Sequence, residues 1–475
     1  MFLFEGSADY GLTRFIFQRG LGFIYFIGFL ILVQQFVPLL GEKGLLPVPL
    51  FLKRASFTDA PSLFFIHFSD TFAAVLAFLG LGLAVLALTG ISDNYGIWVS
   101  AIVWGLLWLL YLSFVNVGQT FYGFGWETLL LETGFLAIFL GSKDAAVPVV
   151  LIWLLRWVLF RLMFGAGLIK LRGDSCWRDL SCMMYHYETQ PMPNPLSWYF
   201  HHLPPILHRI EVASTHFVEV IVPWFFFVPG IPGAVAGLVT IVFQGMLILS
   251  GNLSWLNYIT IVLCISCFND KIITSIIRIA PFQTAPASTL REVIVGTLAL
   301  MIGVLSIKPA RNLFSSSQIM NTSFDSLHLV NTYGAFGSIT RDRMEVIVQG
   351  TKDIVITPAT QWLEYEFKGK PGDPKRRPPI VSPYHLRLDW QMWFAAMNSY
   401  VYHPWIVTLV AKLLQGDQPL LGLLRTNPFP DAPPRYIRLE LYHYKFVDKE
   451  DSSGNWWVRK RVEGYLPPLS LADFF

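Results

Sequence analysis

The feature that most constrains the fold of this chain is a series of long apolar runs before residue 308. A helix that crosses a bilayer needs about 20 mostly apolar residues, and six runs come close to that length. Short connections between several of them favour antiparallel neighbouring helices. Three weaker runs raise the expected number of spans from six to at most nine. The six firm candidates are Phe15–Val37, Phe72–Thr89, Ile97–Val115, Val147–Ile169, Ala234–Leu249 and Val293–Ile307, and the weaker ones are Trp126–Leu140, Phe217–Val228 and Leu253–Phe268.

The composition also indicates an integral membrane protein. Hydrophobic residues make up 54% of the 475 residues and charged residues only 14%, whereas a soluble domain usually carries about 25% charged residues. The formal net charge of +3 gives no indication of a nucleic-acid partner. The first apolar run is too long for the core of a cleavable signal peptide, so we expect it to be retained as the first span. Lysine and arginine occur on both sides of most short loops, and the charge bias therefore does not fix the orientation.

The sequence changes character after Ile307. Charged residues and prolines become frequent, and the apolar runs shorten to strand length. This second part is long enough to bury a core of its own. We predict a polytopic α-helical membrane domain at residues 1–307, which includes a polar segment at 170–214, followed by a soluble β-rich domain at residues 308–475.

Four runs in the second part predict strands. Residues 435–447, RYIRLELYHYKFV, alternate with a period of two, which places Ile437, Leu439 and Leu441 on one face. The turn DKEDSSGN and the run WWVRKRV that follow predict a hairpin. MEVIVQG and QWLEYEFKG are further strand candidates, and a helix near Pro404–Leu414 is expected to pack on the sheet.

Ionisable residues inside the apolar runs are candidates for a functional site, because a charge at membrane depth is costly. Glu127 and Glu132 lie in WETLLLETGF, and Arg156 and Arg161 lie in LLRWVLFRLMF. We expect the glutamates of one helix to neutralise the arginines of the next, with a direct chemical role as the alternative. Residues five apart diverge by about 140° on a helix, so neither pair forms a tight dyad.

Lys170, His216 and Glu219 are the candidate catalytic residues. His216 and Glu219 are three residues apart and share a helix face. The carboxylate either orients the imidazole as a general base or fixes the helix against a neighbouring loop. Lys170 closes an apolar run, where a lysine normally extends to the headgroups, although a partly buried lysine can act as a base. We favour the structural interpretation for all three.

The histidine-rich run NPLSWYFHHLPPILHR, residues 194–209, is not expected to bind a metal. Adjacent His201 and His202 cannot easily point the same way, and two prolines separate them from His208. A metal site needs three or more converging ligands. We interpret this run as an ordered interfacial segment in which the aromatic side chains lie at the headgroup level.

The four cysteines are too few for a disulfide framework. Cys264 and Cys267 form a C-x-x-C spacing inside an apolar run, and we expect them to be packing residues. Cys176 and Cys182 lie in the polar segment and can form a disulfide if that segment faces an oxidising compartment.

Several long runs resemble the lipase maturation factor family. The longest is MFGAGLIKLRGDSCWRDLSCMMYHYETQPMPNPLSWYFHHLPPILHRIEVASTHFVEVIVPWF. Others are VNTYGAFGSITRDRMEVIVQGT, EYEFKGKPGDPKRRPPIVSPYHLRLDWQMWFAA and PRYIRLELYHYKF, so that the resemblance covers nearly the whole chain. The residues of the signature segment are Asp174, Trp177, Asn194, Trp198, His201, His202, His208 and Arg209.

The resemblance implies a multi-pass membrane protein that assists the folding and assembly of secreted lipases. It implies no established reaction and no cofactor, and the expected partners are a secreted lipase-like client and the lipid bilayer. An animal member would reside in the endoplasmic reticulum membrane, and a bacterial member in the cytoplasmic membrane. Client binding is expected within residues 308–475. Its aromatic residues either form the core or bind an extended client segment; they are Tyr436, Tyr442, Tyr444, Trp456 and Trp457.

A more distant likeness suggests an enzyme as the alternative. The run AGLIKLRGDSCW is similar to the A-G-x-K-K-L-D-x-D-W run of vitamin K-dependent gamma-carboxylases, in which the second lysine is the catalytic base. Lys170 is the matching position, while Ile169 replaces the first lysine and the spacing after Lys170 differs. The alternative function is therefore an integral membrane enzyme that uses Lys170 as a base.

Overall fold

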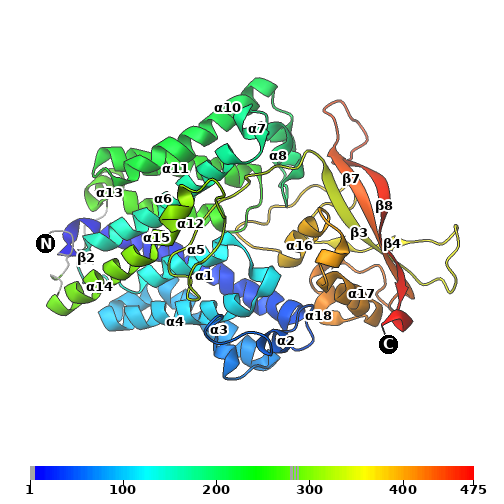
Figure 1. The fold of residues 1–475 in the computed structure, drawn as a ribbon, viewed down its shortest axis with the longest axis horizontal. Coiled ribbons are helices and arrows are strands. Elements are labelled where there is room, and N and C mark those ends of the chain that lie inside the picture. The colour runs from blue at the N-terminus through cyan, green and yellow to red at the C-terminus, as the bar shows by residue number, and fades with distance from the viewer. Residues whose placement is uncertain (1–5, 279–281, 283–284, 286–287, 475) are drawn as a thin grey trace.

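The structure is a computed structural model that describes residues 6–278, 282, 285 and 288–474. Membrane helices form one end of the molecule and an antiparallel sheet forms the other (Figure 1). In the described residues, six helical stretches are long and apolar enough to cross a membrane, or eight if two bent pairs each count as one span. The predicted fold class is confirmed. The six are α1 (Gly11–Leu40), α3 (Asp70–Thr89), α4 (Ile97–Val117), α6 (Val149–Arg172), Pro205–Phe227 and α11 (Ile231–Ser250).

Two of the weaker predicted spans differ from the structure. The run Phe217–Val228 is the second half of a span in which α10 (Pro205–His216) continues into a π-helical turn, Phe217–Ile221, and a 3-10 turn, Val222–Phe227. The run Trp126–Leu140 forms α5 (Gly125–Ala137), whose 13 residues rise only about 20 Å. This is less than the hydrocarbon thickness of a bilayer, about 30 Å, so α5 is a short buried helix.

The remaining two predicted spans are bent. The first, Val293–Ile307, belongs to α14 (Thr289–Leu305) and α15 (Ile307–Leu313), which meet at 42°. The second, Leu253–Phe268, contains α12 (Leu256–Cys264) and a 3-10 turn, which meet α13 (Asp270–Ile276) at 107°. A break of this size leaves backbone groups that a lipid-exposed helix cannot satisfy, so it must be buried in protein.

Helix α1 is the central element of the membrane part and contacts α3, α5 and α12. Its Gly22 lets α3 approach closely, because a Cβ at this position would lie 2.8 Å from the backbone nitrogen of Leu88. The shorter elements connect these helices. They are β1 (Gly6–Ser7), α2 (Val48–Leu52), β2 (Val147–Pro148), α7 (Ser175–Arg178), α8 (Met183–Thr189) and α9 (Ser197–His201).

The larger sheet is antiparallel and contains the predicted strands. Among the described residues its order is β4 (Leu363–Glu364), β3 (Arg343–Thr351), β7 (Tyr436–Phe446) and β8 (Trp457–Ser470). Ile437, Leu439 and Leu441 are all buried, which confirms the predicted face. Helix α17 (Trp405–Gln415) contacts β7. Near this sheet lie β5 (Glu366–Phe367), α16 (Arg387–Ala395), α18 (Gln418–Leu421) and β6 (Leu424–Thr426).

The second face of this sheet is also covered. Tyr444 and Trp457 are 0% and 1% exposed and form a cluster with Ile347 and Phe446. Trp198, from the signature segment, packs against this cluster. Two of the five aromatic residues considered for client binding, Tyr444 and Trp457, are therefore core residues.

The segment after α15 links the two ends of the molecule. It crosses over the membrane helices before it enters β3 (Figure 1). Gly165 on α6 lets this segment approach the helix closely, because a Cβ there would lie 2.6 Å from the carbonyl oxygen of Tyr333. One hydrophobic cluster extends from α1 to β8. The residues after 307 therefore share a core with the membrane helices, whereas the sequence suggested a separate core.

Candidate functional site

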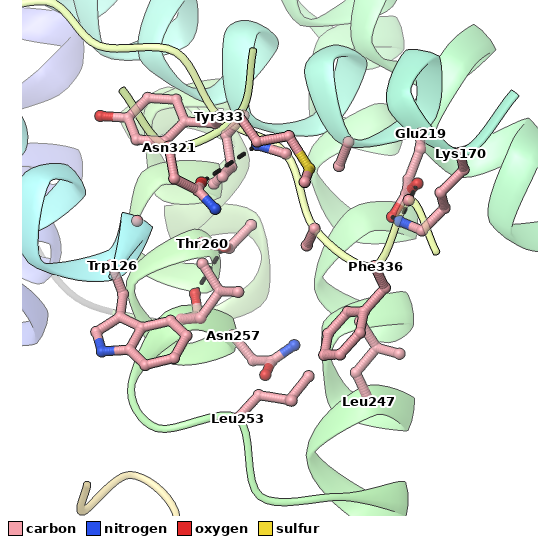
Figure 2. A pocket seen from close by; sticks show the side chains of 18 of the residues that line it. Trp126, Lys170, Glu219, Leu247, Leu253, Asn257, Thr260, Asn321, Tyr333 and Phe336 are labelled. Atoms are coloured by element: carbon pink, nitrogen blue, oxygen red, sulfur yellow. Dashed lines mark hydrogen bonds and ion pairs between the residues drawn. The ribbon is translucent and has the colours of Figure 1, made fainter. Parts of the chain in front are cut away.

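A cavity of about 380 Å³ lies between α6, α11, α12 and the segment of residues 320–338. Its wall is mainly apolar, and polar side chains reach it at a few points (Figure 2). Predominantly apolar cavities with a few convergent polar groups are typical small-molecule sites. Two candidate residues, Lys170 and Glu219, lie on its wall.

Lys170 and Glu219 form a buried ion pair at this cavity. The Lys170 Nζ lies 2.7 Å from Oε1 and 2.6 Å from Oε2 of Glu219, and both residues are 5% exposed. Lys170 comes from the last turn of α6 and Glu219 from the π-helical turn. Gly167 allows the two elements to approach, since a Cβ there would lie 2.7 Å from Cγ2 of Val220. The expectation that Lys170 extends to the headgroups is therefore wrong.

His216 lies near this pair but is held by another partner. Its Nε2 is 2.9 Å from the carbonyl oxygen of Trp177. The Trp177 ring also lies 5.4 Å from the Lys170 Nζ, and its indole N–H donates to the Phe336 carbonyl at 2.9 Å. Among the described residues His216 has no hydrogen bond to Glu219, because the lysine takes both carboxylate oxygens. The favoured structural role of His216 agrees with these contacts.

His186 is a cavity residue that the sequence did not indicate. It lies on α8, is 7% exposed, and its ring meets Phe336 edge-on at 5.0 Å. Burial, with a smaller effect from Lys170, lowers the pKa of His186 to about 4, so the imidazole is neutral at pH 7. In the described part of the chain neither ring nitrogen makes a hydrogen bond. Nothing in the motif MMYHYET distinguishes this histidine from a packing residue.

Asn257 and Gln244 supply a second polar point of the wall. Asn257 Nδ2 donates to Gln244 Oε1 at 2.8 Å, which joins α12 to α11. Both side chains are at least nine-tenths buried. Figure 2 shows the Asn257 amide between Trp126 and Leu247. An amide inside an apolar run is a weak signal in a sequence, and this pair was missed.

The predicted pairing of the membrane charges is half correct. Arg161 binds Glu132, as expected for neighbouring helices. Glu127 instead pairs with Arg387 of α16 at 2.8 Å, far along the chain. Arg156 donates to the carbonyl of Ser266 at 2.9 Å, and no carboxylate pairs with it among the described residues. The prediction failed for Glu127 and Arg156 because their partners do not come from the neighbouring helix in the chain. Arg387 of α16 reaches Glu127, and the turn after α12 reaches Arg156.

The first part of the signature segment joins α6 to the residues before β3. Asp174 caps α7 and pairs with Arg341 at 2.8 Å, and this guanidinium lowers the pKa of Asp174 to about 2. Cys176 and Cys182 are joined by a disulfide with a Cα–Cα distance of 4.7 Å. Cys264 and Cys267 are free and buried.

The second part of this segment contacts α11 and the sheet. Asn194 Nδ2 donates to the carbonyls of Ile248 and Leu249 at 3.2 and 3.0 Å. Trp198 Nε1 donates to the carbonyl of Val447 at 2.9 Å, so this ring packs on the sheet; its position at the headgroup level stays a prediction. Tyr199 is 54% exposed.

The histidines of the segment do not converge on one shared site, because each ring has different neighbours. His202 Nδ1 lies 2.7 Å from the carbonyl of Trp198, and His208 Nδ1 lies 3.0 Å from Glu211. His201 Nε2 is 4.0 Å from Glu188, and burial lowers the pKa of His201 to about 4. Arg209 is exposed. His202 and His208 thus hold the local chain, whereas His201 Nδ1 is buried without a hydrogen-bond partner among the described residues.

The fold and the cavity define a class: a polytopic membrane protein whose C-terminal sheet is joined to the membrane helices. The family model described as the lipase maturation factor transmembrane domain matches residues 12–275, and that of the lipase maturation factor C-terminal domain matches residues 329–467. The chain belongs to the lipase maturation factor family.

Relatives match over nearly all of the chain. Human lipase maturation factor 1 is 44% identical, and the match covers 98% of this chain and 89% of the relative. The mouse protein of the same name is also 44% identical, over 98% and 88% of the two chains. Lipase maturation factor 2 of Xenopus laevis is 30% identical over 98% and 84%. No solved structure matches the chain.

Proposed function

We propose that this protein assists the folding and assembly of secreted lipases. The observation that carries the proposal is the 44% identity to human lipase maturation factor 1, which extends through both the membrane helices and the sheet. A folding factor must present a surface to an incompletely folded client. Strand β8 is the last strand of its sheet, and such an edge can pair with an extended segment. The exposed Val458 and Val462 lie on this strand.

We further propose that the sheet lies on the oxidising side of the membrane, which is the lumen of the endoplasmic reticulum in a eukaryote. The disulfide between Cys176 and Cys182 supports this, because disulfides persist in oxidising compartments. The Asp174–Arg341 ion pair connects the disulfide segment to the residues before β3. A bacterial protein would place the same surface on the outer side of the cytoplasmic membrane.

Deletion of the protein from its host is expected to lower the activity of a secreted lipase per unit of lipase protein. The reason is that a client that cannot complete its assembly leaves the cell inactive or is retained. The measurement is lipase activity and lipase antigen in the medium, with a monomeric secreted hydrolase as the control. Unchanged specific activity together with unchanged secretion would refute the proposal.

A single cysteine introduced at the exposed Ile354, in a chain whose free Cys264 and Cys267 are replaced by alanine, is expected to react from the oxidising side. Ile354 is 69% exposed and lies between β3 and β4, so an impermeant maleimide has access to it. The measurement compares labelling of sealed and permeabilised vesicles of known orientation. A cysteine at Lys143, in the connection between α5 and α6, serves as the matched control on the opposite side of the membrane. Equal labelling of both sites in sealed vesicles would contradict the placement of the sheet on the oxidising side.

A further inference from the structure

The polar end of the cavity carries groups whose charges cancel. Lys170 and Glu219 neutralise one another at 2.6 Å. His186 stands on the same wall, more than nine-tenths buried, and within the described residues its ring nitrogens have no hydrogen-bond partner. These nitrogens are not fully enclosed by protein atoms, so a bound molecule can reach them. A ligand at this end would therefore meet a free hydrogen-bonding group and no net charge.

We propose that this cavity binds one molecule of an uncharged single-chain amphiphile whose head carries a hydroxyl or ester group, the class of monoacylglycerols and long-chain alcohols. The head hydrogen-bonds His186, and the Asn257 amide supplies a second polar contact for an ester oxygen. The chain lies against the apolar side chains of Leu247, Phe243 and Met163, which line the same space. This proposal does not depend on the proposed function.

The position of the cavity in the membrane part fits the orientation of such a molecule. Lys170 is two residues from the end of α6, whereas Met163 lies about two turns deeper in the same helix. On α11, Leu247 is near the end and Phe243 is about one turn deeper. The polar end thus lies where the helices end, and the apolar wall extends toward the bilayer interior.

The size of the cavity selects a single chain. Small-molecule sites have volumes of about 300–1,000 Å³, and 380 Å³ lies near the lower limit. A diacyl phospholipid does not fit that space, and its phosphate would meet Glu219 as well as Lys170. Met320 and Phe394 line the cavity and are 39% and 36% exposed. They mark an entrance between the segment before β3 and α16.

The test uses the purified full-length protein in detergent and a photoreactive monoacylglycerol with a diazirine in its acyl chain. Labelled peptides are mapped by mass spectrometry, and labelling is competed with unlabelled monooleoylglycerol, oleyl alcohol, oleate or dioleoylphosphatidylcholine. We expect labels in the second half of α11 and the first half of α12. Monooleoylglycerol and oleyl alcohol compete, and oleate and the phospholipid do not at the same concentration.

Two variants and one control make the assignment specific. Leu247→Trp fills the cavity and is expected to reduce labelling of these peptides at least about tenfold, because the chain loses its space. Leu238→Trp is the matched control on α11, since Leu238 is 54% exposed and does not line the cavity; labelling stays within about twofold. His186→Phe keeps the ring packing but weakens binding of the hydroxyl probe about 2- to 10-fold. It leaves binding of the hydrocarbon of the same chain length unchanged, because that molecule has no head group to hydrogen-bond.

The outcomes separate the alternatives. Labels spread over the lipid-facing helices, or an equal loss in Leu238→Trp and Leu247→Trp, overturn the proposal. Competition by oleate or phosphatidylcholine as effective as that by monooleoylglycerol overturns the ligand class. If Leu247→Trp does not elute as a folded protein, Ala166→Leu, on the α6 wall of the same cavity, replaces it with the same expectation.

Discussion

Replacing Glu132 by alanine is expected to lower the free energy of unfolding by about 3–5 kcal/mol, because it leaves a buried charge without its partner. Glu132 and Arg161 are each 1% exposed. The carboxylate also accepts hydrogen bonds from the Asn331 backbone N–H at 3.0 Å and from the Tyr333 hydroxyl at 2.6 Å. The substitution thus removes the counterion of Arg161 and the contact that fastens the segment before β3 to α5.

The measurement is an unfolding titration of the detergent-solubilised protein, followed by tryptophan fluorescence. Arg311→Met is the control, since Arg311 is exposed at the end of α15, and its expected effect is within about 0.5 kcal/mol. The double variant Glu132→Leu/Arg161→Met is expected to recover part of the loss, because an apolar pair can replace a buried ion pair at little cost. A loss below about 1 kcal/mol in Glu132→Ala would contradict the central role of this carboxylate.

Replacing Lys170 by methionine is expected to destabilise the protein by a similar amount, about 3–5 kcal/mol, because Glu219 then remains buried and uncompensated. The double variant Lys170→Met/Glu219→Leu removes both charges and is expected to restore most of the stability. We also expect it to support lipase secretion at the level of the unmodified protein. The two readouts are the unfolding titration and the specific activity of the secreted lipase in a host that lacks its own copy.

The double variant decides between a structural and a chemical role of Lys170. A folded and stable double variant that fails to mature lipase would show that Lys170 or Glu219 itself is required, as the alternative enzyme function expects. Normal maturation by the double variant would exclude Lys170 as an essential base. The single variant cannot decide this, because loss of folding and loss of chemistry both abolish activity.

Local sequence patterns predicted those elements whose burial follows directly from the order of apolar and polar residues along the chain. The period of two in residues 435–447 predicted β7, and its buried residues Ile437 and Leu439 follow from that alternation. Burial of the second face could not be predicted in the same way. Tyr444 and Trp457 are covered by Trp198, which comes from a segment far away in the sequence. Apolar length likewise predicted α1 and α6, but not the bends after α12 and α14.

The candidate site was predicted only in part, for a related reason. Lys170 and Glu219 were recognised as unusual because a charge in an apolar run is costly. Their pairing depends on the π-helical turn and on the approach at Gly167, and neither has a periodic signal. His186 was missed because a histidine in a polar segment is unremarkable until the fold buries it.

The shared core has a consequence for how naturally occurring amino-acid changes in this family are interpreted. Arg387 of α16 finds its counterion on α5, and Gln35 of α1 donates to the carbonyl of His385 at 2.7 Å. A fragment that begins at residue 308 would leave the Arg387 guanidinium without its counterion Glu127. An inactivating change in the C-terminal part therefore identifies a client contact only after the membrane helices of the same variant have been shown to be intact.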